Sequence, residues 1–151
     1  RFGVFSAKVG SVALFLLANL FFVMVLALLA GYLFNPSSAG VAEILRVVLA
    51  YLVTFLPLFV FSLGVVLLSN LLRSGTAVFF LTVLVYFALH SFGIVFSRYS
   101  SFFITSSFDW YTLWIADKVN WGKIFRQLLI LLGCGMMLFA AGYSLFERKD
   151  L

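Results

Sequence analysis

The sequence predicts an all-α protein, a polytopic transmembrane helical bundle of four long helices with a short interfacial or re-entrant helical segment before the last. Hydrophobic residues make up 65% of the 151-residue chain and charged residues 10%, against about 45–50% and about 25% in soluble domains. Four apolar stretches each supply the about 20 residues that a helix needs to cross a bilayer. The alternating period of membrane barrel strands is absent, and an open sheet cannot satisfy its edge hydrogen bonds in lipid.

We expect one transmembrane domain over residues 1–151, with the crossing helices at about 11–34, 41–72, 76–96 and 124–146. Arg1 and Lys8 precede the first helix, and their long side chains can reach lipid headgroups. A turn at residues 35–38, which include Asn and Pro, ends this helix. The second helix is longer than the bilayer requires and carries Pro57, so we expect it to be tilted, kinked or partly outside the membrane. A short connection around Arg73 leads into the third helix.

The least hydrophobic segment is residues 97–123, which we expect to form an extracytoplasmic excursion. Ser106 and Asp109 have the spacing of a capping box. A helix that starts there would place Trp110, Trp114 and Trp121 on one face. Because indole is apolar with one polar N–H, this face is predicted to be an interfacial anchor rather than a ligand site.

Few polar side chains lie within the predicted helices. Asn19, Thr54 and His90 are candidate intramembrane polar residues, and His90 is predicted to be a neutral residue that hydrogen-bonds between helices. Small residues four apart, Ser6 with Gly10 and Ala27 with Gly31, favour close helix approach, inside the bundle rather than along a translocation path or at a dimer seam. The single cysteine, Cys134, is predicted to be a small packing residue. A mostly apolar interior favours an amphiphilic cargo over a small ion.

No catalytic, cofactor-binding or metal-binding residues are predicted. His90 and Ser91 are adjacent, so their side chains diverge on a helix and cannot form a nucleophile–base pair. Neither a metal-ligand pattern nor a phosphate-binding loop is present, so any ATP-driven function requires an ATPase on another chain. The net charge of +5 lies outside the apolar cores and does not predict binding to nucleic acid.

Charge bias does not orient the chain. If both ends are cytoplasmic, five basic residues lie on each side, so the positive-inside rule makes no choice. The chain begins at Arg1 rather than Met, and we expect sequence to precede it.

The order of these features resembles the C-terminal two thirds of type-2 ABC transporter permeases, the membrane subunits of ABC exporters. A basic start, a helical hairpin, a tight basic return, a polar aromatic excursion and a last helix rich in Gly lead to the tail Phe146-Glu147-Arg148-Lys149-Asp150-Leu151. In that family the last helix commonly ends in a Phe-x-Arg-basic-Asp-aliphatic tail.

The resemblance implies a multi-pass subunit of a bacterial or archaeal inner membrane, with Lys8, Arg73, Arg148 and Lys149 on the cytoplasmic side. It also implies two kinds of partner: a second permease subunit, the same or related, and cytoplasmic ATPase subunits that bind ATP and Mg. Membrane lipid surrounds the pair. Two alternatives stay open, a non-transporting scaffold or assembly protein that binds partners through the Trp residues, and a membrane enzyme that uses His90.

Overall fold

The computed structural model describes residues 2–34, 40–72, 74–95, 108–115 and 120–149. Their regular structure is helical, with no strand in these ranges, and the all-α prediction is confirmed. The helices are α1 (Phe2–Phe34), α2 (Val41–Leu71), α3 (Gly75–Val95), α4 (Tyr111–Ile115) and α5 (Trp121–Lys149). Four of them, α1, α2, α3 and α5, are long and apolar enough to cross a membrane, so the chain is a membrane protein.

The first and last of the long helices, α1 and α5, extend beyond their apolar segments. α1 begins at Phe2 rather than near residue 11, and α5 runs from Trp121 to Lys149 rather than from 124 to 146. A helix satisfies its own backbone hydrogen bonds, so it continues through polar residues such as Lys8 until a capping residue or turn ends it. At the start of α5 that residue is Asn120, whose side-chain oxygen accepts a hydrogen bond from the Lys123 N–H at 3.2 Å.

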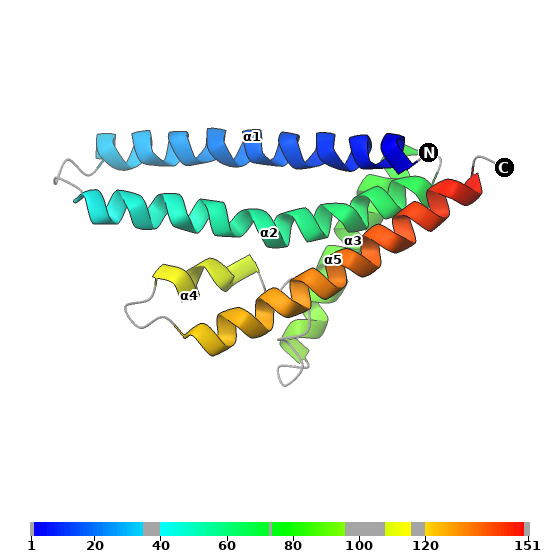
Figure 1. The fold of residues 1–151 in the computed structure, drawn as a ribbon. Helices are drawn as coiled ribbons and strands as arrows, with labels where there is room; N and C mark the ends of the chain where they lie inside the picture. The colour runs from blue at the N-terminus through cyan, green and yellow to red at the C-terminus, as the bar shows by residue number, and fades with distance from the viewer. Residues whose placement is uncertain (1, 35–39, 73, 96–107, 116–119, 150–151) are drawn as a thin grey trace.

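α2 is the central helix of the bundle. α1 runs antiparallel along it, α5 crosses it diagonally, and α3 lies behind α5 in the view of Figure 1. α4 lies beside α2 at the end of the molecule away from the two chain termini, which lie close to one another (Figure 1). α2 continues without a break through Pro57, whose ring is buried. Because proline has no N–H, this helix lacks one backbone hydrogen bond at its middle.

The core consists of two clusters, both built on α2. The first joins Phe5 and Val9 of α1 to Leu63 and Val66 of α2, and the partly buried Phe139 of α5 packs on them. The second joins Val60 of α2 and Leu131 of α5 to Trp110, which directly precedes α4. Cys134 packs against this second cluster, as a packing role predicts. Each cluster packs α5 against α2, so these two helices form the most extensively packed pair of the bundle.

Glycines allow close approach, but at positions other than those predicted. Nothing lies within 4 Å of a Cβ built on Gly10 or Gly31, so close packing there is wrong for the single chain. A Cβ on Gly135 would lie 3.4 Å from the Val60 side chain, and one on Gly142 would lie 3.1 Å from the Phe5 ring. Small-residue spacing shows that a helix can approach a neighbour, whereas tertiary packing decides which face does so.

Large apolar side chains cover the outer faces of α1 and α3. On α1 these include Leu14, Phe15, Phe21 and Phe22, each more than 60% exposed; on α3 they include Phe79, Phe80, Leu84 and Phe87. Apolar area of this extent is stable against acyl chains or against helices of another subunit, and not against water.

Candidate functional site

A polar junction connects three helices near the end where both termini lie. The Lys8 ammonium of α1 donates a hydrogen bond to Asn70 Oδ1 of α2 at 3.1 Å and another to Ser69 Oγ at 3.4 Å. The Asn70 amide donates in turn to the backbone oxygen of Gly142 in α5, at 3.3 Å. Asn70 is only 7% exposed, so its amide is a buried polar group whose two ends are both satisfied. We call Lys8, Ser69, Asn70 and the Gly142 carbonyl the three-helix junction.

The position of the ammonium has a physical reason. α2 ends at Leu71, so Lys8 meets the last turn of that helix, where the backbone dipole is negative. A cation within a membrane segment is costly unless it is paired or reaches the interface. Lys8 was predicted to reach outward to headgroups, and the structure instead directs its ammonium to α2.

An aromatic cluster lies beside the junction. Phe5 is 1% exposed, and its ring centroid lies 5.2 Å from that of Phe139, 5.9 Å from Tyr143 and 5.7 Å from Phe146. Because Gly142 has no side chain, the Phe5 ring can lie directly against α5. The first turns of α1 are therefore held to α5 by ring packing and to α2 by the Lys8 hydrogen bonds.

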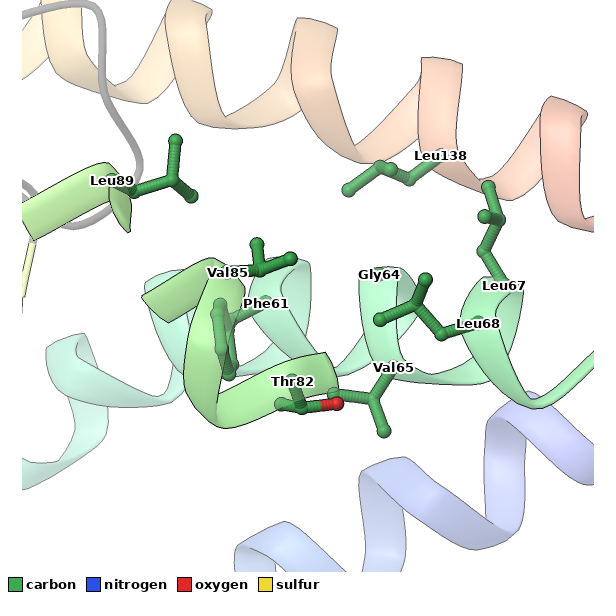
Figure 2. Close-up of a pocket in the computed structure, with 9 residues that line it drawn as sticks. All are labelled: Phe61, Gly64, Val65, Leu67, Leu68, Thr82, Val85, Leu89 and Leu138. Atoms are coloured by element: carbon green, nitrogen blue, oxygen red, sulfur yellow. The ribbon is translucent and has the colours of Figure 1, made fainter. Parts of the chain in front are cut away.

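A second feature is an apolar pocket of about 220 Å³ between α2 and α3, closed on one side by α5 (Figure 2). Its walls are side chains of Phe, Leu and Val with a single hydroxyl, that of Thr82 on α3. The Thr82 oxygen is buried and has no hydrogen-bond partner among the described residues. The pocket is lined by Phe61, Gly64, Val65, Leu67, Leu68, Thr82, Val85, Leu89 and Leu138.

The three predicted intramembrane polar residues do not come together. Asn19 is exposed and donates to Phe15 O in its own helix at 3.1 Å, and Thr54 donates to Ala50 O at 2.7 Å. His90 is exposed and stacks on Tyr86, four residues earlier, with ring centroids 6.1 Å apart. The interhelical hydrogen bond predicted for His90 is not found within the described part of the chain.

The tryptophans meet, but not on one helix. Trp110 ends a short turn at 108–110, Trp114 lies in α4 and Trp121 begins α5, so the prediction of a single helix through all three is wrong. Asn120 starts a new helix before Trp121. The Trp114 ring centroid nevertheless lies 5.9 Å from Trp110 and 6.2 Å from Trp121.

Burial separates the roles of these rings. Trp110 is 3% exposed and packs on Val60 and Leu131, so an exposed indole face is wrong for this residue, whereas Trp121 is 69% exposed. The proposed cap residue, Ser106, lies outside the described residues, as do residues 96–107 and 116–119 of the predicted excursion.

The basic residues predicted to be cytoplasmic are only partly described. Arg148 and Lys149 lie in the last turn of α5, at the end of the molecule where α1 begins (Figure 1). Arg73 lies outside the described residues. Within the described ranges, no group of three or more His, Cys, Asp or Glu side chains could hold a metal ion.

Sequence reasoning missed the three-helix junction because Asn70, near the end of the predicted second helix, is not among the intramembrane polar residues it singles out. A useful signal was present: Lys8 and Asn70 both lie near the ends of adjacent antiparallel helices, where a lysine and an amide at the same depth can pair.

Searches of protein-family models, curated proteins and solved structures find no match to this chain.

Proposed function

We propose that this chain is the permease subunit of an ABC exporter, or a portion of one, and forms a translocation path with a second subunit, the same or related. ATP and Mg bind to a separate cytoplasmic ATPase, whose closure tilts the helices by a rigid-body motion. In this proposal both ends of the chain face the cytoplasm of a bacterial or archaeal cell.

The three-helix junction is the observation that supports the proposal most. A force from an ATPase would enter near the start of α1, and this is where Lys8 joins α1 to α2 and Phe5 joins it to α5. Asn70 links those two helices through Gly142. A displacement of α1 would thereby be transmitted to α2 and α5, the most extensively packed pair of helices, and the three would move together.

The apolar pocket supports an amphiphilic cargo. Its walls offer acyl-like surface and one hydroxyl, whereas a small ion requires charged or carbonyl ligands (Figure 2). The exposed apolar faces of α1 and α3 leave area for a second subunit as well as for lipid.

Coupling to an ATPase can be tested with the chain expressed in its native membrane. We expect a nucleotide-hydrolysing subunit to co-purify with it, and ATP hydrolysis by the complex to depend on the junction. Asn70→Leu removes the central amide and should reduce the stimulation of hydrolysis severalfold. The matched control is Asn19→Leu, since Asn19 donates to Phe15 O of its own helix, and it should leave the stimulation unchanged.

Two results would contradict the proposal. One is a stable, functional chain with no nucleotide-hydrolysing partner, which would favour a scaffold or assembly protein. The other is an Asn70→Leu complex that is folded and coupled as well as the parent, which would remove the junction from the mechanism.

A further inference from the structure

A polar pocket lies at the opposite end of the molecule and takes no part in the proposed transport mechanism. Its volume is about 320 Å³, and it is formed by the turn at 108–110, α4 and the first two turns of α5. Its charged residues are one acid, Asp109, and two bases, Lys123 and Arg126. The remaining lining residues are Trp110, Thr112, Leu113 and Gln127.

Two buried polar atoms of this pocket lack partners in the described part of the chain. They are the Trp110 Nε1, a donor, and the Gln127 Oε1, an acceptor. Trp110 is 3% exposed, so its N–H has been removed from water without compensation from these residues. A buried donor or acceptor left without a hydrogen bond destabilises the fold. Two such atoms in the lining of one pocket indicate a ligand that supplies both an acceptor and a donor.

The position of the pocket along α5 indicates which layer of the membrane surrounds that ligand. Lys123, Arg126 and Gln127 occupy the first turns of α5, and the apolar run of this membrane-crossing helix starts at Leu128. The pocket therefore lies where a crossing helix leaves the hydrocarbon, the level of lipid headgroups. The exposed Trp121 beside it has the amphipathic ring typical of this layer.

We propose that this pocket binds the headgroup of a zwitterionic phospholipid that carries a primary ammonium, such as phosphatidylethanolamine. The phosphate accepts from Lys123 and from the Trp110 N–H, while the ammonium donates to Asp109 and to Gln127 Oε1. The positive charge of Arg126 and the N-terminal dipole of α5 add to the attraction for phosphate. A purely anionic headgroup would bring its charge to Asp109 with no cation of its own.

Tryptophan fluorescence offers a direct readout, because the chain has three tryptophans and all three lie at or beside the pocket. The whole chain in mild detergent is titrated with short-chain phosphatidylethanolamine, phosphatidylcholine and phosphatidylglycerol, and with free phosphoethanolamine. We expect saturable binding that is tightest for phosphatidylethanolamine, and weaker binding of free phosphoethanolamine, which lacks acyl chains.

Three variants assign the contacts. Lys123→Gln, at an exposed position, should weaken binding of phosphatidylethanolamine about tenfold, the scale of one charged hydrogen bond. Asp109→Asn should abolish the preference for phosphatidylethanolamine over phosphatidylglycerol. Trp110→Phe keeps an aromatic ring, smaller than indole, at this buried position and deletes the N–H, and should weaken binding of all three lipids.

Arg46→Gln is the matched control, since it removes one positive charge from the second turn of α2, at the same end of the molecule but outside the pocket. It should bind as the parent does. Equal affinity for the three lipids, unchanged binding by Lys123→Gln, or binding of free phosphoethanolamine as tight as that of the lipid would each overturn the proposal. None of these results depends on an ATPase, so they leave the transport proposal to its own test.

Discussion

Gly142 is the residue at which α5 comes nearest to α1. A Cβ there would lie 3.1 Å from Cζ of Phe5, a ring that is 1% exposed and has little room to move. Gly142→Ala should therefore destabilise the fold by about 1–3 kcal/mol, the usual cost of overpacking. Thermal unfolding in detergent measures the change.

The control for this substitution is Gly133→Ala on the same helix, where a Cβ meets nothing within 4 Å. Alanine favours a helix over glycine by about 0.5–1 kcal/mol, so this variant should be at least as stable as the parent. If both variants unfold at the same temperature, the Phe5 contact is not tight.

Thr82 has a buried hydroxyl oxygen with no hydrogen-bond partner among the described residues. Thr82→Val exchanges the hydroxyl for a methyl group of similar shape and should stabilise the chain by about 1 kcal/mol. If the hydroxyl contacts cargo, the same variant should also transport less.

Thr54→Val is the comparison for Thr82, because Thr54 donates to Ala50 O at 2.7 Å. Loss of that bond should leave stability unchanged or lower it slightly. A Thr82→Val chain that is less stable than Thr54→Val would mean that the Thr82 hydroxyl has a partner after all.

At the scale of elements, much of the fold follows from the solvent. Lipid requires each crossing segment to satisfy its backbone internally, so runs of apolar residues predict α1, α2, α3 and α5 with few alternatives. The relations between helices follow from side-chain shape at a few contacts, which composition does not encode. Gly10 and Gly142 both suit close approach, and only Gly142 has a ring beside it.

For the three-helix junction too, the sequence predicts where a residue lies along its helix but not which residue of another helix it meets. Lys8 was recognised as a residue near one end of the membrane, yet its partner is 62 positions away in sequence. The pairing of Lys8 with Asn70 depends on how α1 and α2 align, which the packing of Phe5 and Val9 with side chains of α2 helps to determine. Periodicity within either helix contains no information about that alignment.

The three-helix junction predicts energetic coupling between elements. Lys8→Met and Asn70→Leu should each destabilise the chain, and the double variant should lose less than the sum of the two, by about 0.5–1.5 kcal/mol. Chemical unfolding of the four proteins supplies the cycle. Pairing Lys8→Met with Asn19→Leu should instead give additive losses, since Asn19 bonds to Phe15 O of its own helix.

At the scale of the whole molecule, four helices long enough to cross a membrane predict that the start of α1 and the end of α5 lie on one side of the bilayer and the polar pocket on the other. Figure 1 shows the two termini at one end, with α4 and the start of α5 toward the other. Single cysteines can test this arrangement in a Cys134→Ala background. Gly3 and Glu147 mark the end with the termini, and Gly40 marks the opposite end.

In sealed vesicles a maleimide that cannot cross the membrane should label the cysteines at Gly3 and Glu147 from the same side, and the cysteine at Gly40 from the other. Each position lies near a helix end, so the thiol should react in the wet interface and not in hydrocarbon. Labelling of Gly3 and Glu147 from opposite sides requires an odd number of crossings. That result would mean that one of the four helices does not span the membrane, and α3, which packs least against the other three, is the first to examine.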